Sequence, residues 1–295
     1  MSWLSNVVIE TTKPKDSIIG VIRKNLAGYQ DARDRSQLHA SDITKDTFCP
    51  RQWHLEDVQD IKPNPQYIPT ALATTFSLGN SIARLFIENW AGQSVIGNWE
   101  CLICGAFKTL SKNPSGWCNS GKKHIWKYHE FVVEAKEYDV SGSIDAIFDL
   151  GSPLWHISEL KILAAEAFEK IVVPMPEHRI RTSLYLKLIA ESTSVWKQNF
   201  NLQEARIVYV SRGYGKANPQ WDGEILPIKE FVIKRDDAST DLLLKKAKAL
   251  KLARGGGGVP SGICSTALDA PAKKCNVCKS CFSGDYKATI NLEDL

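Results

Sequence analysis

The spacing of apolar residues along the chain predicts a series of helices. In the stretch KDSIIGVIRKNLAGY, apolar residues recur every three or four positions after a cap at Asp16 or Ser17, which is typical of an amphipathic helix. A second, short helix should break where Cys49 precedes Pro50, because the residue before a proline is pushed out of the helical region. Further helices are predicted over residues 70–90, 164–171, 177–192 and 237–253.

Alternation of apolar and polar residues predicts the strands. Residues 130–163 contain three strand-like runs separated by turn residues, which is the pattern of a β-meander. Two more strands are predicted over residues 205–211 and 230–234. The mixture of helices and strands indicates a mixed α/β fold.

Two segments interrupt this regular pattern. Residues 98–129 lose the apolar periodicity and are rich in Gly, Lys and Ser, with three cysteines, so we expect a small inserted module. A GGGG run at residues 255–258 predicts a flexible hinge in front of a cysteine-rich tail. The expected parts are a helical N-terminal part, the insert, a core and a hinge with its tail, over residues 1–97, 98–129, 130–254 and 255–295.

The composition is that of a globular protein, and we expect the chain to stay in the reducing cytoplasm. No apolar run approaches the roughly 18 residues that span a bilayer, and the stretch MSWLSNVVIETTKPKD lacks the features of a secretory signal. In a reducing compartment the eight cysteines favour metal ligation over disulfides. A net charge of +4 and a pI near 8.5 are compatible with a polyanionic partner, but also with an ordinary protein.

The insert contains cysteines at the spacing of a zinc ribbon. Cys101 and Cys104 form a CxxC pair, Cys118 follows, and His124 is the preferred fourth ligand, with His129 as the alternative. This spacing predicts a Cys₃His site for Zn²⁺ rather than three buried thiols. The lysines and tryptophans around it suit single-stranded nucleic acid, although such residues are also common on solvated loops.

The stretch SGSIDAIFDLGSPLWHISELK contains charged residues in two strand-like runs. Glu159 and Lys161 are two residues apart, so in a strand they point to the same face, and a turn at DLGSP would bring Asp145 against Glu159. Two carboxylates provide the oxygen ligands that Mg²⁺ or Mn²⁺ prefer, and a lysine can orient an attacking water. The pattern predicts phosphodiester hydrolysis. The alternative is an exposed strand face beside a turn.

The order of these motifs resembles that of the PD-(D/E)xK nuclease superfamily. Within it, the sequence is similar to RecB-like and CRISPR-associated-type iron–sulfur exonucleases, especially phage-encoded members. The matching motifs, spread over about residues 41–282 without the insert, are CPR, GxxD, ExK, a helix with Tyr185, and the cysteine tail. The resemblance implies a restriction-endonuclease-like core, a mixed central sheet flanked by helices, with a zinc-ribbon-like insert and an iron–sulfur staple.

The resemblance also implies which residues act on DNA. Asp145 and Glu159 would bind Mg²⁺ or Mn²⁺ together with the backbone carbonyl of Leu160, and Lys161 would orient the nucleophilic water. The expected catalytic residues are Asp145, Glu159, Lys161 and Tyr185, and Leu160 contributes only its carbonyl to the metal.

Two positions depart from the family pattern. The family has a QxxxY helix, in which Tyr185 matches, but Arg181 stands where the glutamine is expected. We expect both residues to help hold the DNA strand. The family's histidine metal ligand is replaced by Ala83, and Glu88 or Glu130 could substitute for it.

The resemblance further implies a [4Fe–4S] cluster that joins the tail to the N-terminal part. Cys49, Cys264, Cys275 and Cys281 are the expected ligands, because relatives often end in Cys-x₅-Cys, and Cys278 would be spare. A competing interpretation makes the four tail cysteines a zinc site and leaves Cys49 as a buried thiol.

Together these features predict a metal-dependent DNA exonuclease of a bacterial, archaeal or phage-infected cell. It would act on DNA ends or single strands in recombination, replication or repair, with DNA and a replication or recombination protein as partners. The oligomeric state is left open. Two other functions remain: a non-catalytic DNA-binding or assembly factor on a nuclease scaffold, and a zinc-ribbon adaptor.

Overall fold

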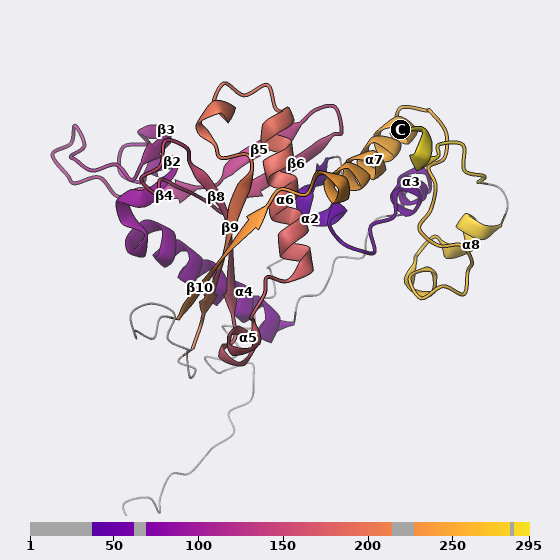
Figure 1. The fold of residues 1–295 in the computed structure, drawn as a ribbon, viewed down its shortest axis with the longest axis horizontal. Coiled ribbons are helices and arrows are strands. Elements are labelled where there is room, and N and C mark those ends of the chain that lie inside the picture. The colour runs from indigo at the N-terminus through magenta and orange to yellow at the C-terminus, as the bar shows by residue number, and fades with distance from the viewer. Residues whose placement is uncertain (1–36, 62–68, 214–226, 284–285) are drawn as a thin grey trace, which may run out of the picture.

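The computed structural model describes residues 37–61, 69–213, 227–283 and 286–295 (Figure 1). The helix expected after Asp16 lies outside these ranges. Within them, no helix is both long enough and apolar enough to cross a bilayer.

A mixed central sheet forms the middle of the molecule (Figure 1). Its strands follow the order β10-β9-β8-β7-β2-β3, and β4 also pairs with β2. β8 and β9 run parallel and the other neighbours run antiparallel. The strands are β2 (Val95–Cys101), β3 (Phe107–Lys112), β4 (Trp126–His129), β7 (Ala146–Phe148), β8 (His156–Leu163), β9 (Glu204–Ser211) and β10 (Ile228–Lys234).

A second, smaller sheet lies beside the central one, with the order β1-β6-β5. It contains β1 (Leu38–His39), β5 (Phe131–Ala135) and β6 (Val140–Ile144). The expected meander over residues 130–163 is therefore divided: β5 and β6 belong to this sheet, whereas β7 and β8 belong to the central sheet. The chain bends at Asp145, between β6 and β7, and so passes from one sheet to the other.

Helices cover the central sheet and extend beyond it. α4 follows the predicted helix but ends in a π-helical turn, η2, and the predicted helices over residues 164–171, 177–192 and 237–253 are confirmed as α5, α6 and α7. The helices are α2 (Ala40–Ile43), α3 (Pro50–Val58), α4 (Thr70–Leu85), η2 (Phe86–Trp90), α5 (Ala165–Lys170), α6 (Pro176–Glu191), α7 (Asp237–Arg254) and α8 (Cys278–Phe282).

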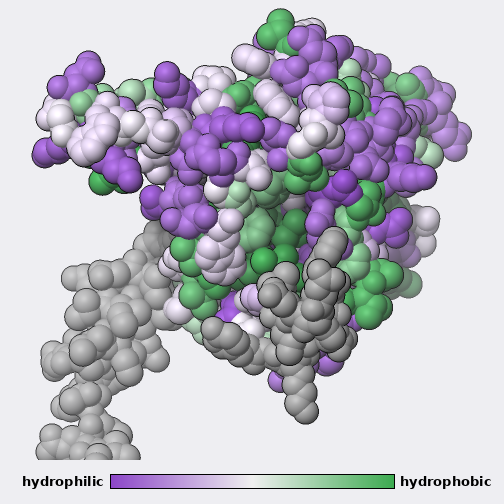
Figure 2. All heavy atoms as spheres, turned by 60° about the vertical axis from the view of Figure 1, so that its left-hand side comes forward, coloured by the Kyte–Doolittle hydropathy of each residue, from purple (hydrophilic) through white to green (hydrophobic). Residues whose placement is uncertain are grey.

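Alternate residues of β8 face two different hydrophobic cores. Ile157 is packed in one core with Leu184 of α6, whereas Leu160 is packed in the other with Phe86 of η2. Because successive strand residues point to opposite faces, Glu159 and Lys161 point to the face that α6 covers. Figure 2 shows apolar side chains gathered near the middle of one side of the molecule, bordered by hydrophilic ones.

The cysteine-rich tail returns to the first part of the described chain. α8 lies beside α3 (Figure 1), and Ser280 donates a hydrogen bond to Gln59 at 3.4 Å. Arg51 of α3 donates to the carbonyl of Pro260 at 2.9 Å. The ends of the described chain thus pack together, although more than two hundred residues separate them in sequence.

Candidate metal sites

Asp145 lies at the corner where the two sheets meet. The register of β7 and β8 pairs Ala146 with Ser158. When this antiparallel register is extended by one residue, Asp145 lies opposite Glu159. The register of β5 and β6, extended in the same way, places Glu130 on its other side. Directly opposite side chains in a ladder are neighbours. The registers therefore place Glu130 and Glu159 on either side of Asp145, although the three carboxylates are not grouped as tightly as the cluster of the insert described below.

The predicted catalytic residues are in contact with one another. The Nζ atom of Lys161 lies 2.7 Å from Oε1 of Glu159 and 3.4 Å from Oδ2 of Asp145. The backbone amide of Leu160 donates to the same Asp145 oxygen at 2.8 Å, and its carbonyl accepts from Lys161 at 3.2 Å. The turn after β7 thus brings the Asp145 carboxylate to that of Glu159, as the sequence pattern indicates.

Glu159 is almost completely buried, with a side-chain exposure of 1%. Its Oε1 atom accepts from both Lys161 and Arg181, the latter at 3.0 Å, whereas its Oε2 atom is buried without a hydrogen-bond partner. A buried carboxylate oxygen without a partner is costly unless a cation or donor reaches it. The second oxygen of Glu159 is therefore suited to a metal ion.

The charged groups change one another's proton affinity. Burial is the main reason that the pKa of Asp145 is raised, and Lys161 opposes this effect. Glu130 lies at the surface, yet local desolvation and then the Asp145 carboxylate raise its pKa to about 7. Burial alone would lower the pKa of Lys161, but Asp145 and Glu159 raise it on balance. The lysine is accordingly a cation at neutral pH.

Arg181 and Tyr185 both lie on α6, above this corner. Arg181 is directed at Glu159, as described above. Tyr185 is buried, and burial followed by the Glu159 and Asp145 carboxylates raises its pKa. Its ring lies against Gly142: a Cβ atom added there would be 2.6 Å from the ring carbon Cε1 of Tyr185. The glycine of the GxxD motif therefore allows α6 to approach β6.

Replacing Gly142 with alanine should destabilise the protein by about 1–3 kcal/mol, the usual range for overpacking a core. The ring of Tyr185 would have to move away from β6, together with the helix that carries it. Thermal and urea unfolding would measure the loss. Gly151→Ala is not a suitable control because its φ is +79°; Gly79→Ala in α4, where the nearest atom is 4.0 Å from the added Cβ, should be neutral or stabilising.

The two candidate substitutes for the missing histidine ligand differ in their contacts. Both carboxylate oxygens of Glu88 already have partners: Oε2 pairs with Arg84 at 2.8 Å, and Oε1 accepts from the amide of Tyr128 at 3.1 Å. Ala83 packs against the core that contains Phe86. Glu130 is the better candidate, because its carboxylate lies beside Asp145.

A buried histidine that the sequence pattern does not single out positions α6. His178 shares a hydrogen bond of 2.9 Å between its Nδ1 atom and the hydroxyl of Tyr209, which also accepts from the amide of Met175. Burial and then Lys161 lower the pKa of His178 to about 4, so the ring is neutral. Since Tyr209 pairs with Lys161 across β8 and β9, this contact fixes the start of α6 over the corner.

The second candidate site lies in the insert. Cys101, Cys104, Cys118 and His124 place their ligand atoms within 4.8 Å of one another, so the cluster could hold a metal ion. The Sγ atoms of Cys101 and Cys118 are 3.7 Å apart, and Nδ1 of His124 lies 3.1 Å from each. Around tetrahedral zinc with bonds of about 2.3 Å to sulfur, neighbouring sulfur atoms are about 3.8 Å apart.

The structure also distinguishes between His124 and His129, the two candidates for the fourth ligand. His129 is not part of this cluster; instead its Nε2 atom lies 2.9 Å from the carboxylate of Glu100. Within the cluster, the hydrogen bond to His124 lowers the pKa of Cys101 against the effect of burial, while burial and the neighbouring thiols raise that of Cys118. Thiols packed this closely are all deprotonated only when a metal ion binds them.

The tail cysteines lie near Cys49 but do not form a tight cluster like that of the insert. Burial and then Cys49 raise the pKa values of Cys264 and Cys275, and Cys281 adds to both effects. Arg51 lies 3.8 Å from the sulfur of Cys281. Within the described ranges, the insert cluster is the only group in which three or more ligand atoms all lie within 4.8 Å of one another.

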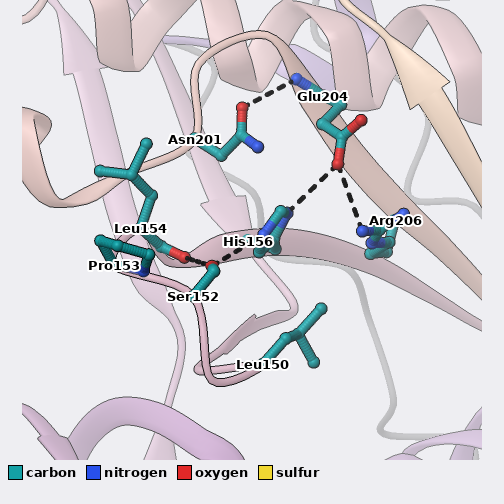
Figure 3. Close-up of a pocket in the computed structure, with 8 residues that line it drawn as sticks. All are labelled: Leu150, Ser152, Pro153, Leu154, His156, Asn201, Glu204 and Arg206. Atoms are coloured by element: carbon teal, nitrogen blue, oxygen red, sulfur yellow. Dashed lines mark hydrogen bonds and ion pairs between the residues drawn. The ribbon is translucent and has the colours of Figure 1, made fainter.

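An open pocket of about 510 Å³ lies on the other face of β8 (Figure 3). His156, Glu204 and Arg206 line it, with the Glu204 carboxylate between the other two, 3.8 Å from Nδ1 of His156 and 3.2 Å from Arg206. These residues belong to the face of the sheet opposite Glu159. The pocket is thus separate from the carboxylate corner.

Comparisons with known proteins identify no family. No family model and no curated protein matches the sequence. Among solved structures, the chain is similar to the crystal structure of SSO0001, with 13% identity and a TM-score of 0.37, over 90% of this chain and 93% of that chain. A likeness this distant supports no conclusion about function.

Proposed function

We propose that the protein is a metal-dependent deoxyribonuclease of the PD-(D/E)xK type, an exonuclease acting on DNA ends or single strands. The observation that carries the proposal is the buried, unpartnered Oε2 atom of Glu159, next to Asp145 and within reach of a protonated lysine. Most buried polar side-chain atoms in proteins have a hydrogen-bond partner. An oxygen left without a partner supports a binding role for this corner.

The donor set suits Mg²⁺ or Mn²⁺. Asp145, Glu159 and the carbonyl of Leu160 offer hard oxygen ligands, which these ions prefer. When bound, the ion would supply Lewis-acid activation of the phosphate and of a water molecule. Glu130 is the substitute for the missing histidine, because it can add a third carboxylate on the open side of Asp145.

The side chains around the corner would each have a separate role in the reaction. Lys161 would orient the attacking water with its ammonium group and offset the negative charge that grows on the phosphate. Its raised pKa supports the role of a cation rather than that of a base. Arg181 would hold Glu159 in place and offer its remaining N–H groups to the DNA backbone, and Tyr185 would hold α6 against β6.

The test is degradation of end-labelled single- and double-stranded DNA in Mn²⁺ or Mg²⁺, with Ca²⁺ as the control ion. We expect stepwise shortening from an end with Mn²⁺ or Mg²⁺ and intact DNA with Ca²⁺. Binding without cleavage by protein that contains its full complement of metal would favour the non-catalytic scaffold instead.

The tail cysteines support a [4Fe–4S] cluster rather than a single zinc ion. The thiolates around such a cluster each bind a different iron atom, so they are held further apart than the ligands of one ion. Cys49 lies close enough to Cys264 and Cys275 to raise the pKa of both, which agrees with a ligand set that includes Cys49. Cys49, Cys264, Cys275 and Cys281 are the proposed ligands.

The insert would hold Zn²⁺ through its three cysteines and His124. His124→Ala should remove most of the bound zinc, whereas His129→Ala should retain about one equivalent, because His129 pairs with Glu100 instead. Metal analysis of the two purified variants would measure this. Equal zinc in both variants would contradict the assignment of His124.

A further inference from the structure

We propose that the outer surface of the insert binds single-stranded DNA and directs it to the carboxylate corner. The insert module is defined as residues 98–129. This inference deepens the proposed function, on which it rests for the choice of DNA as substrate.

The insert module carries a strong excess of positive charge. It contains one acidic residue, Glu100, whose carboxylate lies 2.9 Å from His129. Lys112 pairs with Asp149 outside the module at 2.8 Å. The other lysines are exposed and have no ion pair within the described part of the chain; they are Lys108, Lys122, Lys123 and Lys127. A surface of this charge favours a polyanion.

The candidate metal site fixes an aromatic side chain among these lysines. Trp117 and Lys123 lie opposite each other in an antiparallel bridge, and the next residues, Cys118 and His124, point to the metal cluster. Since adjacent residues of an extended segment point to opposite sides, the bridge presents Trp117 and Lys123 on the outside. Trp117 is 71% exposed, which is unusual for so large an apolar side chain.

A second aromatic ring lies on the exposed face of the module's strands. The registers of β2 with β3 and β4 place Phe107, Glu100 and Lys127 in one row across three strands. Phe107 is 55% exposed, and its ring lies 6.1 Å from that of His129. The opposite face is packed, because Trp99 there is fully buried. The module thus offers two rings with lysines beside both.

The module leads directly to the carboxylate corner. β4 ends at His129, and the next residue, Glu130, lies opposite Asp145. The loops that join β2, β3 and β4 project from the left edge of the molecule in Figure 1. A strand bound along the module would therefore continue along β4 toward Asp145.

A single strand is the occupant that fits both features. Its phosphates meet the lysines, and its unpaired bases expose π faces that stack on aromatic side chains. A duplex hides those faces inside its own stack. A protein partner would need acidic groups to pair with the lysines. It would not explain why two aromatic rings are exposed beside them.

The test is the affinity of a fluorescent oligothymidylate, measured by anisotropy on the Asp145→Asn protein without Mg²⁺ or Mn²⁺. Trp117→Ala should raise the Kd about tenfold and Trp117→Phe by less than about threefold, because phenylalanine still stacks. Lys122→Ala/Lys123→Ala should reduce the slope of log Kd against log[salt] by about 1.4. The matched pair Lys245→Ala/Lys246→Ala on α7 should leave it unchanged.

Zinc analysis of each variant would show that the module is intact. Unchanged affinity in Trp117→Ala, equal salt slopes for the two lysine pairs, or equal affinity for a duplex of the same length would overturn the inference. Because binding is measured without cleavage, the two proposals can fail separately. Normal cleavage and unchanged oligothymidylate affinity in Trp117→Ala would support the nuclease and contradict this surface. Binding that depends on Trp117, in a protein that never cleaves DNA, would support the surface and contradict the nuclease.

Discussion

Asp145→Asn should reduce Mn²⁺-dependent DNA cleavage by at least about a thousandfold, since the loss of one charged ligand disturbs both the metal and the orientation of the water. Asparagine keeps the size of the side chain and an acceptor for the amide of Leu160, so the fold should survive. Lys161→Met should cause a loss of similar size without abolishing metal binding. Cleavage of an end-labelled strand and Mn²⁺ titration of each variant would separate the two effects.

The matched control is Asp149→Asn. Asp149 is also an acidic residue in the segment after β6, but its carboxylate pairs with Lys112 at 2.8 Å, and that pair lowers its pKa. Cleavage by this variant should remain within about twofold of the wild type, because partly exposed ion pairs contribute little. If Asp145→Asn and Asp149→Asn were equally active, the assigned site would be wrong and the scaffold interpretation would replace it.

The sequence predicts the local features of the corner because they depend on strand periodicity. Side chains two residues apart share a face, so Glu159 and Lys161 could be placed together before the fold was known. The turn after β7 could likewise be expected to bring Asp145 to them. What the pattern does not contain is the bend at Asp145, because residues on both sides of it alternate as in one continuous meander.

The bend at Asp145 determines which residue provides the third carboxylate. Glu130 reaches Asp145 only because β5 pairs with β6 in one sheet while β7 pairs with β8 in another. Strand pairing between sheets is a tertiary property, and the sequence named both Glu88 and Glu130 without placing either of them beside Asp145. The contact between His178 and Tyr209 is of the same kind, because it joins α6 to β9.

The replacement of Cys49 by alanine should have the largest effect on stability. A cross-link from Cys49 to the tail would close a loop of more than two hundred residues, for which the chain-entropy model gives about 5 kcal/mol. The packing of α8 on α3 and the bond from Arg51 to Pro260 would remain, but they are few. The variant should lose absorbance near 400 nm after anaerobic purification and should unfold at a lower urea concentration.

Cys278→Ala is the control that distinguishes the two ligand sets. Cys278 lies between Cys275 and Cys281 and is spare in the proposed cluster, so this variant should keep both the absorbance and the stability. In the alternative zinc site, Cys278 is a ligand and Cys49 is not. Loss of metal in Cys278→Ala with retention in Cys49→Ala would therefore reverse the assignment. The opposite result would mean that the metal stabilises the protein by joining its two ends, since Cys49 and the tail have no covalent link other than the chain between them.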